Sequence, residues 1–308
     1  MTETPRRRLY LVDGYALIFR AFFALGDQRQ LLNSRGENTA IARGALEFLR
    51  RLLEKHKPEY LGWVHDAGLS FRHEKFPEYK ATREKLEPEL QADFDSGVER
   101  VEEILAGYRI PILSLEGYEA DDVIGTLAKQ AAASGVEAVI VSGDKDFVQM
   151  VGPGISILNP WHGRPGQTTE KWYDESNAAD RLGVPANRVV DYLALLGDTS
   201  DNVPGVKGIG DKTAIALIER WGPLESILEH VDEVEPKRAR TALQAHGANG
   251  VLSKDLVTIR TDLAMKLDLE ALRVREPDWK TLRDLFVRLE FRTQAQEAAA
   301  RVDGGGAG

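Results

Sequence analysis

The sequence predicts an α/β fold with a mostly parallel sheet, followed by an all-helical region. From residue 8 to about 160, short aliphatic and β-branched runs alternate with longer amphipathic stretches, a pattern typical of parallel strands flanked by helices. From about 172 to 298 the strand patterns disappear, and helical patterns separated by glycines replace them. We therefore expect a sheet-based domain at residues 8–171 and a helical domain at 172–298.

The individual elements follow from the same patterns. We expect strands at residues 9–12, 60–64, 110–115, 138–141 and 155–158, and helices at 42–54 and 120–133 among others. In the helical region we expect the helices to end at Gly183, Gly197, Gly222 and Gly247. The last ten residues, 299–308, end in a glycine-rich run and are expected to form a disordered tail or linker.

Composition excludes several classes of protein and site. The 308 residues are 43% hydrophobic and 29% charged, which is typical of a globular chain and not of a disordered one. The absence of cysteine excludes disulfides, zinc-thiolate sites, iron–sulfur clusters and thiol catalysis. Three arginines followed by the apolar residues 9–25 imitate a signal peptide, but Asp13 and Arg20 interrupt that run. We expect a cytoplasmic protein with no membrane partner.

Acidic residues follow several of the expected strands. Asp13, Asp66 and Asp144 each lie at or just beyond the carboxyl end of a strand, the edge where open parallel sheets bind ligands. Each of them taken singly could be a turn or helix-cap residue. Their recurrence favours a shared site, and the net charge of −9 does not exclude a polyanionic partner once such a cluster is set apart.

Further carboxylates are expected at the same edge of the sheet. Glu119, Asp121 and Asp122 begin an expected helix, and Asp146 follows Asp144 by two residues. Acids in a first helical turn have an ordinary explanation in the helix dipole, but that explanation does not cover their coincidence with the strand-end acids. Oxygen ligands without cysteine suit Mg²⁺ or Mn²⁺, and the matching chemistry is two-metal phosphoryl transfer.

A glycine-rich segment marks the helical region. Residues 195–214 read LLGDTSDNVPGVKGIGDKTA, with two glycine turns around Lys207 and Asp211 at the expected N-cap of the next helix. Backbone N–H groups at such a turn, beside Lys207 and Lys212, would suit a nucleic-acid phosphate. The alternative is an ordinary tight connection between two helices.

These residues together resemble a known family. Over residues 8–295 the chain closely resembles the 5'-3' exonuclease domain of bacterial DNA polymerase I and the wider flap endonuclease family. The resemblance is carried, in this order, by the segments LVDGYALIFRAFF, SFRHEKFPEYKATR, GYEADDVIGTLA, SGDKDFVQ and LLGDTSDNVPGVKGIGDKTA. It implies a PIN-like sheet domain, a helical arch and a helix-three-turn-helix DNA-binding domain.

The resemblance also implies roles for individual residues. It implies a site for two or more metal ions held by Asp13, Asp66, Glu119, Asp121, Asp122, Asp144, Asp146, Asp198 and Asp201. Lys80 and Arg83, on the arch, and Arg20 would act on the scissile phosphate. Phe19 would stack on an unpaired base, although a core position beside Phe22 and Phe23 is an equal alternative.

The glycine segment would contact the DNA duplex, and in relatives it also holds K⁺ through backbone oxygens. The residues implied in DNA binding there are Gly205, Lys207, Gly208, Gly210, Lys212 and Thr213. The expected substrate is DNA with 5' flaps, nicks or 5' ends, cut by a monomeric enzyme during replication and repair. The alternatives are a catalytically inactive DNA-binding protein, a PIN-type ribonuclease and a haloacid-dehalogenase-like phosphatase, which the tyrosine at position 15 disfavours.

Overall fold

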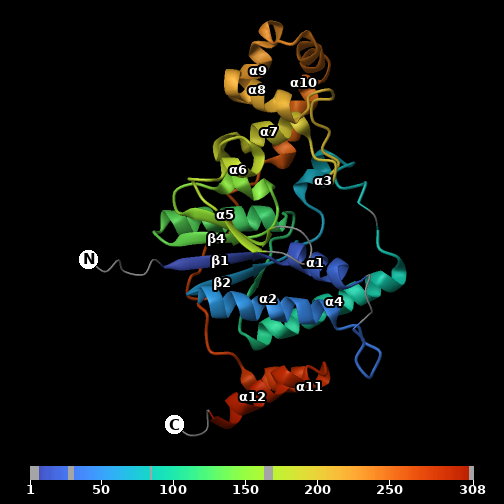
Figure 1. The fold of residues 1–308 in the computed structure, drawn as a ribbon, viewed down its shortest axis with the longest axis vertical. Coiled ribbons are helices and arrows are strands. Elements are labelled where there is room, and N and C mark those ends of the chain that lie inside the picture. Colours follow the sequence, from blue (N-terminus) through green and yellow to red (C-terminus); the bar gives the residue numbers. More distant parts are fainter. Residues whose placement is uncertain (1–6, 27–30, 84, 163–168, 305–308) are drawn as a thin grey trace, which may run out of the picture. The chain divides into compact units, whose positions relative to one another are not determined.

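The chain packs as two compact units. The structure, a computed structural model, describes residues 7–26, 31–83, 85–162 and 169–304 (Figure 1). Unit 1 comprises Met1–Asp66, Lys85–Ser114 and Lys266–Gly308, and unit 2 comprises Ala67–Glu84 and Leu115–Met265. Each unit combines segments that are distant in the sequence, so the units do not follow the expected boundary after residue 171, which stays a prediction.

Unit 1 contains a parallel sheet in the order β3-β2-β1. Strand β1 (Arg8–Asp13) pairs with β2 (Tyr60–Val64), and β2 pairs with β3 (Ile112–Leu113). All of β2 and all of β1 except Arg8 is buried, which explains the continuous apolar runs in the sequence. Because Asp13 is in register with Val64, the carboxyl ends of β1 and β2 lie at the same edge.

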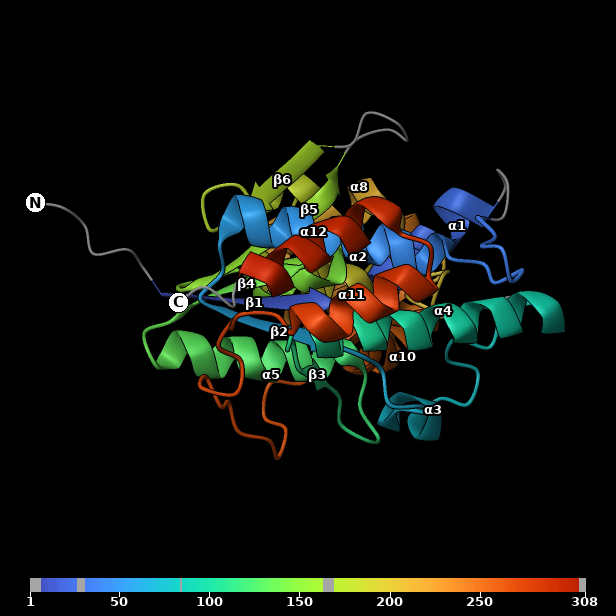
Figure 2. The same ribbon diagram turned by 90° about the horizontal axis from the view of Figure 1, so that it is seen from below.

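Helices α2 (Ala40–His56) and α4 (Pro88–Gly107) lie side by side in unit 1 (Figures 1 and 2). The unit also contains α1 (Gly14–Gly26), α11 (Trp279–Arg288) and α12 (Arg292–Gly304), with α11 packed on α4 and on α12. Gly97 permits the close crossing of α2 and α4, because a Cβ atom there would lie 2.5 Å from the Cδ1 atom of Ile41.

Unit 2 contains strands in the order β4-β5-β6, with α5 (Ala120–Ala133) packed on β4 and β5. Strand β4 (Glu137–Val141) is parallel to β5 (Ile155–His162), whereas β6 (Thr169–Tyr173) is antiparallel to β5. The sequence pattern did not predict β6. Its burial pattern explains this, since only its last residue is buried and no apolar run marks it.

The rest of unit 2 is helical, as expected. Its elements are α3 (Phe71–Lys75), η1 (Asp146–Met150), α6 (Ala179–Leu182), η2 (Ala186–Arg188), α7 (Val189–Leu196), α8 (Asp211–Trp221), α9 (Leu224–Glu229), η3 (Val231–Glu233) and α10 (Lys237–Val257). Gly183, Gly197 and Gly222 end helices with positive φ angles, as expected. The expectation for Gly247 was wrong: it lies inside α10, where a Cβ atom would be 2.8 Å from the Leu228 side chain.

Two other expectations about element lengths need correction. The strand expected at 110–115 shortens to β3, because the Ile110 N–H donates to the Leu105 carbonyl and Pro111 has no N–H. Residues 299–304, expected in a disordered tail, continue α12, since strong helix formers precede the glycines. Residues 305–308 lie outside the described residues. Within the described chain, no helix has the length and apolar character needed to cross a membrane.

The α2–α4 crossing yields a stability prediction. Gly97→Ala should lower the free energy of unfolding by about 1–3 kcal/mol, because the new methyl group would overlap Ile41, whose Cβ atom would be only 2.9 Å away. The higher helix propensity of alanine offsets only about 1 kcal/mol of this cost. Glu99→Ala, an exposed position on the same helix, is the matched control. Denaturant titration of both variants is the measurement, and equal stabilities would contradict the proposed close packing.

Candidate functional site

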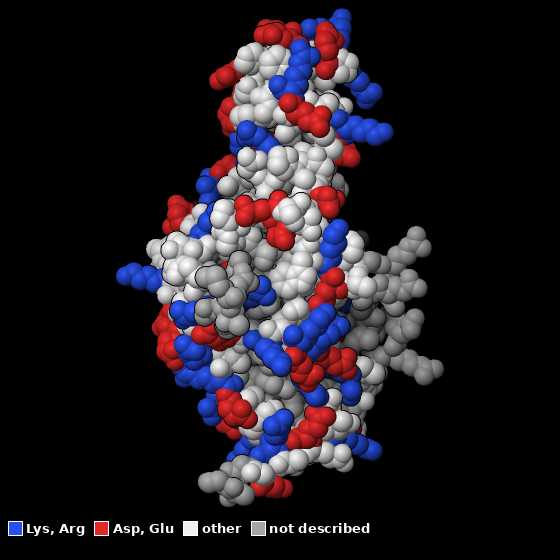
Figure 3. All heavy atoms as spheres, turned by 60° about the vertical axis from the view of Figure 1, so that its left-hand side comes forward, with Lys and Arg blue, Asp and Glu red and all other residues white. Residues whose placement is uncertain are grey.

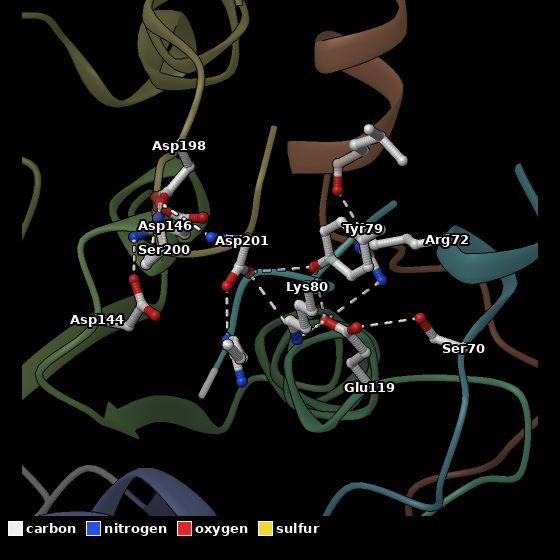
Figure 4. Close-up of polar contacts among 12 residues, drawn as sticks. Ser70, Arg72, Tyr79, Lys80, Glu119, Asp144, Asp146, Asp198, Ser200 and Asp201 are labelled. Carbon is white, nitrogen blue, oxygen red and sulfur yellow. Dashed lines mark hydrogen bonds and ion pairs between the residues drawn. The ribbon is translucent and has the colours of Figure 1, made fainter. Parts of the chain in front are cut away.

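Four charged residues of unit 2 form a cluster after strand β4, here called the Asp146 cluster: Asp144, Lys145, Asp146 and Asp198. Figure 4 labels its three aspartates. The Asp146 N–H donates to Asp144 Oδ1 at 2.9 Å. The Lys145 ammonium donates to Asp198, in the loop after α7, and lies 3.5 Å from Asp146 Oδ1. Two carboxylates that follow β4 are thus brought close to a third from the helical segment.

The negative charge of Asp146 is neutralised less completely by hydrogen-bond donors than that of Asp198, to which Lys145 donates. Its Oδ1 atom is buried and receives no hydrogen bond within the described residues. Burial, followed by the charge of Asp144, raises the pKa of Asp146 to about 7. A carboxylate in this state favours the approach of a further cation.

Lys145 is a functional candidate that the sequence analysis did not single out. Its position between two expected ligands, in the segment GDKDF, was the signal available. Burial lowers the pKa of Lys145, but the charge of Asp146 and the hydrogen bond to Asp198 outweigh burial and raise it. Lys145 therefore carries a positive charge among the expected ligands.

A second group of residues in unit 2, here called the Glu119 cluster, consists of Glu119, Tyr79, Lys80, Arg83 and Asp201 (Figure 4). Lys80 Nζ lies 2.9 Å from Glu119 Oε2 and 3.9 Å from Asp201 Oδ2, and Arg83 donates to Asp201 Oδ1 at 2.6 Å. The Tyr79 hydroxyl lies 3.2 Å from Glu119 Oε2 and 3.2 Å from Asp201 Oδ2. Asp201 and Glu119 are therefore joined through the segment that carries Lys80.

Charges in the Glu119 cluster stabilise one another. Burial raises the pKa of Glu119, but the positive charges of Lys80 and Arg72 outweigh burial and lower it. Burial lowers the pKa of Lys80, but Glu119 and Asp201 outweigh burial and raise it. Tyr79, which the sequence analysis missed, has a pKa raised by burial and by Glu119, so it stays a hydrogen-bond donor.

The structure corrects the helical arch expected around Lys80 and Arg83. Residues 77–83 form turns, and Lys80 has a left-handed φ angle of 57°. The Lys80 N–H donates to the Asp201 carbonyl at 2.9 Å and not to a residue one helical turn earlier. A helix cannot continue through such a residue.

Asp122 differs from the other expected ligands. It is fully buried on α5, and Arg72 donates to both of its carboxylate oxygens, at 2.6 and 2.8 Å. The backbone N–H of Arg260 adds a third bond at 2.8 Å. These contacts occupy lone pairs that a metal would need, and a ligand role for Asp122, which this geometry disfavours, stays a prediction. Its neighbour Asp121 is only half-buried in the first turn of α5.

The remaining expected ligands, Asp13 and Asp66, belong to unit 1. Both lie at the carboxyl edge of its sheet, since Asp13 ends β1 and Asp66 follows β2 by two residues. Asp13 is buried and accepts a hydrogen bond from the Ala16 N–H at 3.2 Å, whereas Asp66 is exposed. His65, which directly precedes Asp66 in the sequence, is buried and accepts a hydrogen bond from the Trp63 indole N–H. Burial lowers the pKa of His65 to about 4, so this side chain is neutral.

Helix α1 presents aromatic and basic side chains. Phe19 is 39% exposed and stacks on Phe94 with ring centroids 4.6 Å apart, and Arg20 beside it is also exposed. The alternative that Phe19 is a core residue is therefore wrong. Phe22 takes the core position instead, with 7% exposure.

The glycine loop of unit 2, residues 205–210, has two distinct parts. Gly205, with φ of 60°, allows close backbone contact, because a Cβ atom there would lie 2.4 Å from the Gly197 nitrogen. Its N–H is not directed outwards as expected, since it donates to the Ser253 hydroxyl at 2.9 Å. Lys207 and Lys212 are exposed.

The start of α8 completes this loop. Gly210 and not Asp211 is the N-cap, while Asp211 is the first helical residue and accepts a hydrogen bond from Tyr192 at 2.7 Å. Gly208 has a φ angle of 98°, and Thr213 lies half-buried in the first turn. The first N–H groups of a helix have no partner within it, so this end offers donors to an anion.

No group of three or more His, Cys, Asp or Glu side chains in the described chain already has an arrangement that could hold a metal ion. The ammonium groups of Lys80 and Lys145 lie between the carboxylates instead. Over the face drawn in Figure 3, basic and acidic side chains are intermixed. An anion that binds on this face would therefore meet local groups and not a large field of one sign.

The raised pKa of Asp146 predicts a pH dependence of stability in the metal-free protein. Between about pH 4 and pH 7 the folded state keeps a proton on Asp146 that the unfolded chain has released, so this residue makes stability fall as pH rises. Asp146→Asn should remove that loss. Its stability relative to the unchanged protein should rise by at least about 1 kcal/mol between pH 4 and pH 8 in urea titrations with EDTA. A difference that stays constant over this range would contradict the burial of an uncompensated charge.

Comparison with protein families gives two matches that together cover most of the chain. Residues 8–183 match the family described as 5'-3' exonuclease, N-terminal resolvase-like domain. Residues 184–280 match the family described as 5'-3' exonuclease, C-terminal SAM fold.

Similar sequences occur in bacterial DNA polymerases I. The chain is 41% identical over 286 residues to DNA polymerase I of Chloroflexus aurantiacus, which covers 92% of this chain and 29% of the relative. It is 39% identical over 288 residues to the thermostable DNA polymerase I of Thermus thermophilus, and the alignment covers 93% of this chain and 32% of the relative. The chain thus spans about a third of the length of these curated relatives.

Solved structures share the fold. The T5 5'-exonuclease with bound zinc has a TM-score of 0.69 and 20% identity, with 95% of this chain and 98% of that chain covered. Human GEN1 in complex with Holliday junction DNA has a TM-score of 0.60 and 16% identity, with 92% of this chain and 67% of that chain covered. At these identities the likeness establishes the fold only. The two family matches and the relatives aligned over more than nine-tenths of the chain show that this protein belongs to the 5'-3' exonuclease family.

Proposed function

We propose that this chain is a metal-dependent 5' nuclease that hydrolyses DNA phosphodiester bonds by a two-metal mechanism in replication and repair. Its substrates would be DNA with 5' flaps, nicks or 5' ends. Besides family membership, one observation carries the proposal: the half-buried Asp146 has an Oδ1 atom that receives no hydrogen bond within the described residues and lies 3.5 Å from the Lys145 ammonium, with other carboxylates nearby. Such an arrangement gains stability from a bound cation.

The residues present fit oxygen-ligated divalent ions. Carboxylates without thiols suit Mg²⁺ or Mn²⁺, and a T5 5'-exonuclease structure contains divalent ions. When bound, such ions supply a nucleophilic hydroxide and stabilise the leaving oxygen. The proposed ligands are Asp13, Asp66, Glu119, Asp121, Asp144, Asp146, Asp198 and Asp201, and we propose that Asp122 pairs with Arg72 in place of a metal.

Basic side chains of unit 2 would act on the substrate phosphate. Lys80 and Arg83 are held by Glu119 and Asp201, so their positive charges are oriented before substrate arrives. Oriented charge of this kind stabilises negative charge that develops in the transition state. Exchange of these ion pairs for contacts with the phosphate would free Glu119 and Asp201 for metal ligation.

Other residues would bind the DNA. Exposed Lys207 and Lys212 flank the glycine loop and would contact duplex phosphates together with the first turn of α8. The backbone oxygens of this loop are also the proposed site for K⁺. On α1, exposed Phe19 would stack on an unpaired base, and Arg20 would contact the scissile phosphate.

An experiment on three aspartates tests the metal assignment. Asp144→Ala and Asp146→Ala should lose cleavage of a 5'-labelled flap duplex in Mg²⁺ but keep or gain stability without metal, because each removes a repelling charge. Asp122→Ala should instead lose about 3–5 kcal/mol of stability, since it leaves the Arg72 charge buried and unpaired. Flap cleavage with and without EDTA, together with thermal unfolding, makes the measurement.

The same experiment separates this proposal from its alternatives. Near-normal turnover of either Asp144→Ala or Asp146→Ala at saturating Mg²⁺ would show that the metal assignment is wrong. Absence of Mg²⁺-dependent cleavage in the unchanged protein, with flap binding retained, would indicate an inactive DNA-binding protein. Cleavage of an RNA 5' strand alone would indicate a ribonuclease.

DNA binding and catalysis are assigned to different lysines, which yields another prediction. The Lys207→Ala, Lys212→Ala double variant should weaken duplex binding and flatten the salt dependence of affinity by about two units, because each lysine neutralises about one phosphate. Its single-turnover cleavage rate at saturating enzyme should stay close to normal. Lys80→Ala should slow single-turnover cleavage with little loss of affinity. A reversed pattern for either variant refutes this division between binding and catalysis.

A further inference from the structure

Arg72 makes more contacts than a surface arginine of a short helix would. It lies on the five-residue helix α3 and is 2% exposed. Its guanidinium donates to both oxygens of Asp122, and also to the carbonyls of Leu256 at 2.7 Å and Thr258 at 2.9 Å. One side chain therefore connects α3 to the first turn of α5 and to the end of α10.

The partner of Arg72 is held equally firmly. Asp122 is fully buried, and the backbone N–H groups of Glu119 and Arg260 donate to it in addition to Arg72. Burial lowers the pKa of Arg72, but the hydrogen bonds and charge of Asp122 outweigh burial and raise it. Arg72 therefore stays charged, and its paired hydrogen bonds to Asp122 fix the orientation of α3.

The segment that follows α3 carries the proposed catalytic lysine. The Phe76 N–H donates to the Arg72 carbonyl at 2.9 Å, and the Tyr79 N–H to the Phe76 carbonyl at 2.8 Å. At the other end of α3, the Ser70 hydroxyl donates to Glu119 Oε1 at 3.0 Å. A five-residue helix is not stable by itself, so tertiary contacts must set its position.

From these contacts we infer that the Arg72–Asp122 ion pair is a positioning element that places Lys80 against Glu119. The inference rests on the proposed nuclease function for its consequence in catalysis, while the placement itself does not depend on activity. Asp122 thus serves the site through Arg72 and not through a metal. Arg72 is a positioning residue, because it contacts neither Lys80 nor Arg83; its Nη1 atom lies 3.9 Å from Glu119 Oε2, the carboxylate that pairs with Lys80.

The test uses Arg72→Lys, which keeps the charge but cannot reproduce the forked contact with Asp122 or the bonds to both carbonyls. We expect single-turnover flap cleavage at saturating Mg²⁺ to slow by about tenfold or more, as misplacement of a catalytic group does. In the Lys80→Ala background the same substitution should slow cleavage by less than about twofold, because Arg72 acts through Lys80. Lys75→Met is the matched control on α3, since Lys75 pairs with Asp255 outside the site.

A second readout does not require activity. In metal-free protein, acylation of lysines by a succinimidyl ester, followed by mass spectrometry, should label Lys80 slowly because its side chain is 18% exposed and paired with Glu119. Arg72→Lys should raise the Lys80 labelling rate by about threefold or more, while exposed Lys129 of α5 serves as internal reference. If Arg72→Lys does not fold, the paired Arg72→Met, Asp122→Leu variant removes both charges and should show the same two effects.

The outcomes separate the two proposals. Unchanged Lys80 labelling, or a tenfold slowing that persists in the Lys80→Ala background, overturns the positioning role. If a folded Arg72→Lys variant labels faster at Lys80 but cleaves at the normal rate, the proposed consequence of Arg72 for catalysis is overturned. Increased labelling in a protein that shows no Mg²⁺-dependent cleavage supports the placement of Lys80 by Arg72 and refutes the proposed nuclease function.

Discussion

Asp146, Glu119 and Asp122 are carboxylates that the fold of unit 2 has wholly or partly removed from water, and they differ in which cation reaches them. Asp122 is fully matched by Arg72, Glu119 is matched by Lys80, and the Oδ1 atom of Asp146 receives no hydrogen bond in the described chain, although the Lys145 ammonium lies 3.5 Å from it. A buried charge without a partner costs several kcal/mol, so each carboxylate constrains the segments around it. The arrangement of α3, the turns that carry Lys80 and the loop after β4 depends on these pairings.

These carboxylates differ in how completely nearby cations and N–H groups engage their oxygens. That difference separates acids that stabilise the fold from acids whose oxygens are available to a ligand. A carboxylate whose oxygens are all engaged by a guanidinium and backbone N–H groups contributes to stability and cannot also ligate an ion. A carboxylate held by a lysine is in a reversible state, because an ammonium on a flexible chain can move away when a metal or phosphate arrives. Lys145 and Lys80 therefore keep the acidic clusters compact without metal, at positions from which they can withdraw.

The same logic applies to the glycine loop. Gly205 is required because the loop backbone contacts the backbone of Gly197, and its N–H is committed to Ser253. Lys207, two residues later, is exposed and uncommitted to any described carboxylate within hydrogen-bond distance. The loop thus combines an internal half, fixed by backbone contacts, with an exposed basic half.

The sequence by itself determined the element types, the acids after strands β1, β2 and β4, and the family, because apolar periodicity and short motifs are local properties of the chain. It did not reveal β6, whose half-exposed residues carry no apolar run, or the turn conformation of Lys80, which depends on a hydrogen bond to the distant Asp201. Only the tertiary structure decided which acids receive arginine, which receive lysine and which have an oxygen without a hydrogen bond in the described chain. The physical reason is that Asp121 and Asp122 are adjacent and chemically identical in the sequence, while burial and the approach of Arg72, fifty residues away, give them different roles.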